Sequence, residues 1–309
     1  MKDLLEISKA VVVGHAVADA LGVPVEFKKR SYLDDNPVVD MMGYGTHYVP
    51  AGCWSDDTSM SLCTLDSLVN GVNYADMMQK FCEWYGLSKY TATGAVFDCG
   101  ITTSNALSQF SINKLPPLEC GFGEKFDNGN GSLMRVNPLA LYLYNRPIDL
   151  DLKIEIVHNV SKLTHSHERS QVGCGIYCFV LWGILDNPTK AGVEKGLLDA
   201  IRYYKSSPEL ITYYRIFDMD FYKADRSQVK STGYVVDTLE AALWCLMTTD
   251  NYKDCVLKAV NLGDDTDTVA AVAGGLAGAL YGYDSIPLSW RNKLLKLDYI
   301  ESLCSKVFG

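Results

Sequence analysis

The sequence predicts an all-α fold, built as one compact multi-helix domain over residues 1–309. Apolar residues recur at three- and four-residue spacing along most of the chain, which is the period of an α-helix. No two alternating apolar runs are joined by a tight-turn signal, as a β-hairpin would require. Hydrophobic residues make up 48% of the chain, which is ample for a buried core, and no linker or repeat divides it.

The same period places the helices in order. Leu4, Ile7 and Val11 share one face of a first helix, which Gly22 ends. A second helix is expected to begin near Thr58. Further helices are expected at 74–87, 151–163, 168–186, 191–205, 236–248, 252–261, 266–281 and 288–305.

Two of these helices carry packing signals. The 168–186 helix is apolar on nearly every side, which predicts a place in the middle of the bundle. Gly274, Gly278 and Gly282 recur on one stripe of the 266–281 helix. Such small residues predict close approach by a neighbouring backbone.

Two segments, 90–131 and 206–234, follow no helical period. The first is rich in Gly, Pro, Ser and Asn, and the second is rich in aromatic residues. Long irregular segments inside a compact domain are often functional. We therefore expect these two to shape the functional site.

Composition narrows the class of protein. The chain has 28 basic and 37 acidic residues, a net charge of −9, which argues against an extended nucleic-acid surface. Its ten cysteines form no CxxC pair and lie mostly in apolar runs, so free thiols of a reducing compartment are expected. No leader-like segment or apolar run of membrane-spanning length is present. We expect a cytoplasmic monomer that contacts no membrane.

Two acidic runs stand out, Ser55 to Thr58 and Asp264 to Thr268, each directly before an apolar helix. Helix capping would explain one such residue and contributes about 1 kcal/mol. Two carboxylates about 4 Å apart repel each other by roughly 4 kcal/mol at an effective dielectric near 20. Clustering several carboxylates therefore destabilises the fold more than helix capping stabilises it, unless a cation binds between them. Two such runs in one chain favour a metal centre.

The ligand types indicate which metal. Carboxylates with Ser or Thr hydroxyls suit Mg²⁺ or Mn²⁺, whereas Zn²⁺ would call for His or Cys. The close histidine pair, His165 and His167, lies far from both runs in sequence, and the EF-hand pattern is absent. Two ions about 3.5–4 Å apart would activate a water molecule.

Two further segments are candidates for the same site. Glu26 is a carboxylate among apolar residues, although a surface position would also explain it. The loop from Asn128 to Arg135 has glycines whose backbone N–H groups can receive phosphate oxygens. It is neither a GxGxxG nor a Walker loop, and an ordinary loop remains the alternative.

Together these residues resemble the ADP-ribosylglycohydrolase family. The matching segments occur in the family's order and span about residues 10–282; they are 18–27, 52–58, 129–135, 163–165 and 261–268. The resemblance implies an all-α single domain with a binuclear site for two Mg²⁺ (or Mn²⁺) at the base of a cleft. Asp264 departs from some relatives, which have Gly at this position.

The resemblance also implies roles for individual residues. The metal ligands would be Ser55, Asp56, Asp57, Asp265, Asp267 and Thr268. Glu26 would orient or deprotonate the attacking water, so the catalytic set is Glu26, Asp56, Asp57 and Asp267. The substrate-binding set would be Gly129, Asn130, Gly131, Ser132 and Met134 around the diphosphate, with His165 lining the cleft and Tyr234 stacking on the ligand. His165 could instead be structural, and the role of Arg135 stays open.

The implied activity is hydrolysis of the glycosidic bond between ADP-ribose and a modified target, which reverses mono-ADP-ribosylation. The substrate would be an ADP-ribosylated protein or a small ADP-ribose conjugate. Two alternatives stay open: a catalytically silent ADP-ribose-binding or structural protein of the same fold, and a metal-dependent phosphohydrolase. The sequence does not decide the linkage that is cut, Mg²⁺ against Mn²⁺, or a partner transferase.

Overall fold

The computed structural model describes residues 3–309. Within them every regular element is a helix, and extended backbone pairs only at three isolated bridges, so the all-α prediction is confirmed. The α-helices are α1 (Leu4–Gly22), α2 (Arg30–Asp35), α3 (Asp56–Ser67), α4 (Tyr74–Leu87), α5 (Ile101–Ser111), α6 (Asn137–Tyr144), α7 (Leu150–Lys162), α8 (Glu168–Asp186), α9 (Lys190–Tyr204), α10 (Val235–Met247), α11 (Tyr252–Val260), α12 (Thr266–Tyr281), α13 (Leu288–Lys293) and α14 (Leu297–Phe308).

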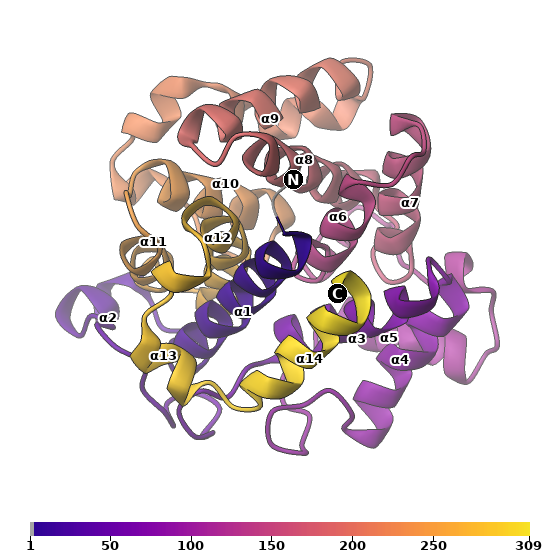
Figure 1. Cartoon of the computed structure of the whole chain (residues 1–309), viewed down its shortest axis with the longest axis horizontal. Helices are drawn as coiled ribbons and strands as arrows, with labels where there is room; N and C mark the ends of the chain where they lie inside the picture. The colour runs from indigo at the N-terminus through magenta and orange to yellow at the C-terminus, as the bar shows by residue number, and fades with distance from the viewer. Residues whose placement is uncertain (1–2) are drawn as a thin grey trace.

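The paired helices α1 and α12 lie at the centre of the bundle, with α14 on the other side of α1 (Figure 1). Two glycines of the predicted stripe make this close pairing possible. A Cβ on Gly274 would lie 2.6 Å from the carbonyl oxygen of Gly14, and one on Gly278 would lie 2.0 Å from that of Ala10. Gly282 was wrongly placed in this stripe: it ends α12 with a φ of 86°, and a Cβ there would meet nothing.

Helix α8 occupies the middle of the other half of the bundle, as predicted. Its residues from Ser170 to Leu185 are buried on every side except at Trp182. It packs against α7 and α9, and small residues again allow the approach. A Cβ on Gly183 would lie 2.2 Å from the carbonyl oxygen of Gly192.

Three parts of the helix prediction differ from the structure. The expected 288–305 helix breaks between α13 and α14, where Lys296 has a φ of 54° and the Leu295 amide donates to the carbonyl of Gly52. The 90–131 segment contains α5, which was not predicted. The short helices α2 and α6 were also missed, because six and eight residues hold too few turns to display a period. The 206–234 segment winds through three 3₁₀ helices, η4 (Pro208–Phe217), η5 (Met219–Lys223) and η6 (Arg226–Gln228).

The ends of α1, α3 and α12 meet at one place. The Gly22 backbone packs against α12 so closely that a Cβ would lie 2.3 Å from the Cα atom of Asp267. The Thr266 hydroxyl donates to the Gly22 carbonyl across 2.8 Å. The start of α12 is thereby fixed at the end of α1.

All ten cysteines are unpaired, with Cys82 and Cys99 half-buried and the others buried. In the described part of the chain no helix has the length and apolar character needed to cross a membrane.

Candidate active site

The two acidic runs meet at the first turns of α3 and α12. The Thr268 hydroxyl donates to the Asp57 carboxylate across 3.2 Å, and the Ser55 hydroxyl donates to the same oxygen at 3.2 Å. Carboxylate oxygens of Glu26, Asp265 and Asp267 all lie within 4.8 Å of one another. Chain segments about two hundred residues apart thus form one acidic centre.

Asp19 organises this centre, and the sequence analysis gave it no role. Its buried carboxylate accepts hydrogen bonds from the Ser55 amide at 3.0 Å and from the Thr58 amide and hydroxyl at 3.0 and 2.6 Å. It therefore takes over much of the capping of α3. This leaves the side chains of Asp56 and Asp57 available for another ligand. The signal in the sequence was a carboxylate within the apolar face of α1.

The acidic centre has unpaired, buried carboxylate oxygens, as a cation site would require. Asp57 Oδ1 and Asp267 Oδ2 are buried and have no hydrogen-bond partner among the described residues. Burial raises the pKa of Asp56, Asp57 and Asp267 well above the ordinary range, and repulsion from neighbouring carboxylates raises it further. Buried carboxylates with free oxygens can hold a hard divalent ion.

Glu26 lies at the edge of this centre and is bonded to His47, a histidine that no sequence pattern had marked. Burial raises the pKa of Glu26 to about 7, although a hydrogen bond with His47 opposes the change. The same bond raises the pKa of His47. Glu26, His47 and Asp98 form a second close group of ligand atoms. No periodicity or motif marked His47 or Asp98, because both lie in irregular segments.

A cleft of about 290 Å³ opens above the acidic centre. Its walls include most of the residues expected from the sequence: Glu26, Asp56, Asp57, Asp265, Thr268, Gly129, Asn130, Gly131, Met134 and His165. Asn130 connects the glycine loop to the acidic centre, since its amide donates to Asp265 across 2.7 Å and to Thr238 across 2.9 Å.

His165 supports the glycine loop from within. Its ring is buried, and burial together with the charge of Arg135 lowers its pKa to about 3, so the ring is neutral at physiological pH. Its Nδ1 atom lies 2.8 Å from the Thr164 hydroxyl. A Cβ on Gly131 would lie 2.7 Å from the ring, whereas one on Gly129 would lie 3.6 Å from it. Only glycine therefore fits at position 131 without displacing the ring.

Arg135 braces the same loop. Its fully buried guanidinium donates to the carbonyl oxygen of Gly131 at 2.5 Å and to that of Val160 at 3.0 Å, and lies 4.9 Å from the ring centroid of Phe81. Burial lowers its pKa to about 10, which leaves it charged at neutral pH. The sequence left the role of Arg135 open; in the structure it holds the backbone of the glycine loop in place.

Two of the expected substrate-binding residues, Ser132 and Tyr234, do not line the cleft. The Ser132 hydroxyl accepts from Ser161 across 2.8 Å and faces α7, so it turns away from the cleft. The ring of Tyr234 packs under the Arg169 guanidinium at 5.7 Å, beside the glycine loop. The hydroxyl of Ser132 is therefore engaged with α7 and not with the cleft.

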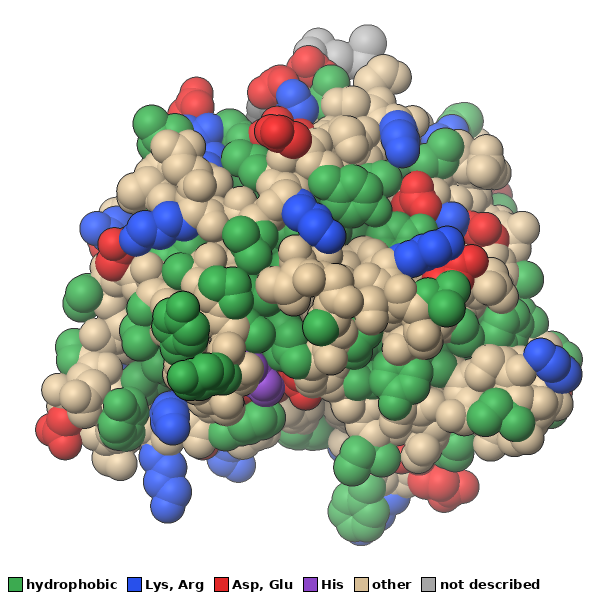
Figure 2. Space-filling view, turned by 90° about the horizontal axis from the view of Figure 1, so that it is seen from below, with side chains coloured by type: hydrophobic (Ala, Val, Ile, Leu, Met, Phe, Trp, Pro, Cys, Tyr) green, Lys and Arg blue, Asp and Glu red, His purple; other side chains and the backbone are tan. Residues whose placement is uncertain are grey.

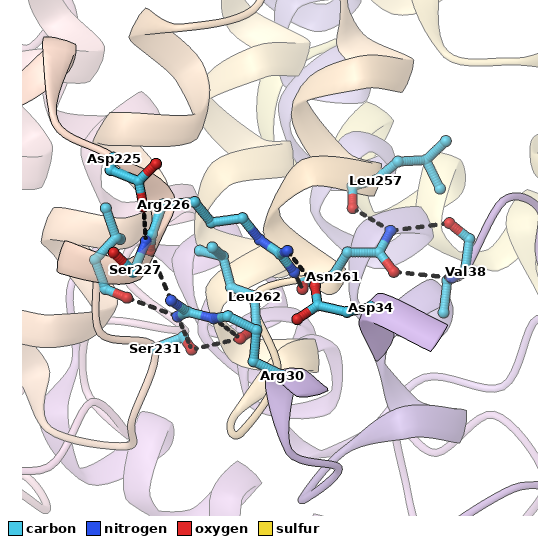
Figure 3. A network of polar contacts seen from close by, with 11 residues as sticks. Arg30, Asp34, Val38, Asp225, Arg226, Ser227, Ser231, Leu257, Asn261 and Leu262 are labelled. Carbon is cyan, nitrogen blue, oxygen red and sulfur yellow. Dashed lines mark hydrogen bonds and ion pairs between the residues drawn. The ribbon is translucent and has the colours of Figure 1, made fainter. Parts of the chain in front are cut away.

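A network outside the cleft holds the second acidic run (Figure 3). Arg30 donates to the carbonyl oxygens of Leu262 at 2.7 Å, of Arg226 at 2.6 Å and of Val229 at 2.6 Å. Arg30 thereby connects α2, η6 and the residue after η6 to the segment that precedes Asp265. One guanidinium fork thus joins three separate segments around the acidic centre.

The fold and site define an all-α protein with a buried acidic centre beneath a cleft and a glycine loop. A family model described as ADP-ribosylglycohydrolase matches residues 1–309. The chain belongs to the ADP-ribosylglycohydrolase family and is an enzyme of this type.

Individual relatives agree with this assignment. The chain is 34% identical over 306 residues to ADP-ribosylarginine hydrolase Tri1 of Serratia proteamaculans, covering 98% of this chain and 79% of that protein. It is 31% identical over 286 residues to ADP-ribosyl-[dinitrogen reductase] glycohydrolase of Rhodospirillum rubrum, covering 91% and 88%. A solved structure titled ADP-ribosylglycohydrolase-related protein complex superposes with a TM-score of 0.83 at 29% identity, covering 100% and 99%.

Proposed function

We propose that the protein hydrolyses the N-glycosidic bond between ADP-ribose and an arginine side chain, and so reverses mono-ADP-ribosylation. The observation that carries the proposal is the convergence of both acidic runs beneath a cleft walled by the glycine loop. The arginine linkage is supported by similarity to relatives named as ADP-ribosylarginine hydrolases, which extends over 98% of the chain.

The metal ligands in this proposal are the six residues of the two runs. Ser55, Asp56 and Asp57 would hold two Mg²⁺ or Mn²⁺ ions from the α3 side, and Asp265, Asp267 and Thr268 would hold them from the α12 side. When bound, such ions supply positive charge that polarises a water molecule and the ribose hydroxyls. The buried, unpaired oxygens of Asp57 and Asp267 support this assignment.

Glu26 is the proposed general base. A carboxylate with a pKa near the working pH exchanges protons most effectively, and that of Glu26 is raised to about 7. Glu26 takes a proton from the attacking water, whose oxygen bonds to C1″ of the distal ribose. The C1″–N bond breaks, and the proton passes to the departing guanidine nitrogen.

The glycine loop is the proposed seat of the diphosphate. Gly129 and Gly131 let a ligand approach the backbone closely, and Arg135 and His165 hold that backbone in place. Because His165 stays neutral, it can donate to or accept from the ligand through one ring nitrogen without adding charge. Asn130 couples this end of the cleft to Asp265.

The decisive experiment uses ADP-ribosylated arginine with Mg²⁺, with Mn²⁺ and with EDTA, and identifies the products by mass spectrometry. Free ADP-ribose and intact arginine, formed only with a divalent ion, are expected. AMP and a ribose phosphate would identify a phosphohydrolase. Thermal stabilisation by ADP-ribose without any product would identify a silent binding protein.

A further inference from the structure

Four large apolar side chains stand exposed at the mouth of the cleft or on the loop whose His47 bonds to Glu26. Their exposed fractions are 66% for Phe27, 59% for Tyr44, 81% for Tyr48 and 79% for Ile101, and we call these four residues the aromatic rim. Phe27 and Ile101 line the mouth of the cleft, and the rings of Tyr44 and Tyr48 lie edge to face with centroids 5.5 Å apart. Exposed apolar side chains are ordinary when scattered, but a group of them beside a site marks a contact surface.

His47 joins the tyrosines of the rim to the cleft. It lies between them in sequence and bonds to the Glu26 carboxylate. Its ring centroid is 6.1 Å from that of Phe27 and 5.1 Å from that of Phe97. The tyrosines are therefore carried by the loop that covers Glu26. In Figure 2, hydrophobic side chains protrude next to a histidine and acidic side chains on one face of the molecule.

The backbone of the rim is held in an unfavourable conformation. Phe27, Tyr44 and Tyr48 have φ values of 64°, 69° and 58°, in the left-handed region that bulky side chains rarely adopt. Conformations of this kind persist where the surrounding structure enforces them and are concentrated at functional sites. Three exposed aromatic residues of one surface share this feature.

The loop that carries the tyrosines is firmly anchored. The Tyr44 amide donates to the Val49 carbonyl at 2.5 Å, and the Thr46 amide donates to the Pro24 carbonyl at 2.9 Å. The Thr46 hydroxyl donates to the Glu26 carbonyl at 2.8 Å. Because the backbone that carries the two rings is already fixed, binding of a partner would cost this loop little conformational freedom.

The geometry of the substrate directs a partner to this surface. With the diphosphate on the glycine loop and the distal ribose at the acidic centre, whatever is attached to C1″ must leave the cleft on the Glu26 side. The cleft of about 290 Å³ is at the low end of ligand pockets, so a folded protein attached at C1″ must remain outside it. The attached group therefore comes to lie against the aromatic rim.

Resting on the proposed function, we propose that the aromatic rim is the docking surface for the folded protein that carries the ADP-ribosylated arginine. Tyrosine and other aromatic side chains contribute most of the binding energy in many protein interfaces. A folded protein presents many more side chains to this surface than a free ADP-ribosylated amino acid does. The rim thus favours modified proteins over small conjugates.

The test compares two substrates in one double variant, Tyr44→Asn with Tyr48→Asn. Asparagine tolerates the left-handed backbone, so the loop keeps its conformation while both rings are lost. We expect kcat/KM for an ADP-ribosylated folded protein to fall about tenfold, through KM, because two exposed aromatic contacts are removed. For ADP-ribosylated arginine kcat/KM should stay unchanged. Phe27 and Ile101 are left intact because they line the cleft.

A matched control removes two apolar side chains of similar exposure from another surface, Ile211→Asn with Tyr214→Asn in η4. This variant should behave as the parent on both substrates. Equal loss on both substrates in the rim variant, or no loss on either, would overturn the docking proposal. The proposal would also be overturned if sedimentation showed the parent protein to be a dimer and the rim variant to be a monomer, because a second copy would then cover the rim. A parent inactive on ADP-ribosylated arginine would instead refute the proposed function.

Discussion

Thr268 and Asp57 share a hydrogen bond of 3.2 Å although 211 positions separate them in sequence. The bond exists because the end of α1 packs against the first turn of α12, while Asp19 of α1 holds the first turn of α3. Helix α1 therefore sets the distance between the two acidic runs. The acidic centre depends on the packing of three helix ends, and not on any single loop.

Replacing Asp267 with Asn should strongly reduce turnover while leaving the fold intact. Loss of one buried charge-stabilising group commonly lowers kcat by about 100- to 1,000-fold. In EDTA the melting temperature should stay the same or rise, because repulsion from Glu26 and Asp57 is relieved. Activity and calorimetric Mg²⁺ binding are the measurements. The control is Asp284→Asn, at a fully exposed carboxylate. Parent-like turnover after exhaustive chelation would contradict the metal assignment.

Replacing Glu26 with Gln should separate catalysis from metal binding. The amide keeps the shape and can still contact His47, but it cannot take a proton from water. We expect kcat to fall by about 100- to 10,000-fold with little change in KM or in Mg²⁺ affinity. Steady-state kinetics and calorimetry measure the two effects. A large loss of Mg²⁺ affinity would show that Glu26 is instead a metal ligand.

The metal-free protein should become less stable as pH rises from 5.5 to 8. Burial raises the pKa of Asp19 to about 6 and of Glu26 to about 7, and also raises the pKa of Asp57 well above its ordinary range. The folded state therefore holds protons that the unfolded state has released, so this stabilisation is complete at low pH and is lost as pH rises through the folded pKa values. Scanning calorimetry in EDTA measures the effect.

The same titration with Mg²⁺ provides the comparison. A cation that binds the ionised carboxylates stabilises the folded state only, and its effect should be larger at pH 8 than at pH 5.5. The rise in melting temperature on adding Mg²⁺ should therefore grow with pH. A rise independent of pH would show that the acidic centre does not bind the ion.

The sequence predicted the fold class and the members of the acidic centre because both depend on local signals. Helical periodicity identified α8, and dense carboxylates before two helices identified Asp57 and Asp267. Asp19 and His47 act through contacts with residues 36 and 21 positions away, respectively, and no local pattern reveals such contacts. The inward turn of Ser132 likewise depends on where α7 packs.

Replacing Arg30 with Gln should weaken the acidic centre from outside the cleft. Three carbonyl oxygens, those of Leu262, Arg226 and Val229, would lose a charged donor, and each such bond contributes about 1.5–3 kcal/mol. We expect lower thermal stability in EDTA and weaker Mg²⁺ binding by calorimetry. Lysine should not restore either property, because it lacks the planar fork.

The control for this network is Arg202→Gln, whose guanidinium is largely exposed and pairs with Asp199 at the surface. Such surface pairs contribute about 0–1 kcal/mol, so both stability and Mg²⁺ affinity should remain close to the parent values. An Arg30→Gln variant with lowered stability but unchanged Mg²⁺ affinity would limit Arg30 to a general structural role.

Replacing Gly131 with Ala should impair binding of ADP-ribose, whereas Gly129→Ala should have a smaller effect. A Cβ at position 131 would lie 2.7 Å from the buried His165 ring, while at position 129 it would make an ordinary contact at 3.6 Å. Relieving the first clash requires His165 or the loop to move, and overpacking of this kind costs about 1–3 kcal/mol. Because the Arg135 guanidinium is bonded to the Gly131 carbonyl, the loop cannot shift without breaking that bond. Calorimetric titration with ADP-ribose should therefore show a Kd about tenfold higher for Gly131→Ala, and equal affinities for the two variants would contradict the role of His165 in shaping the loop.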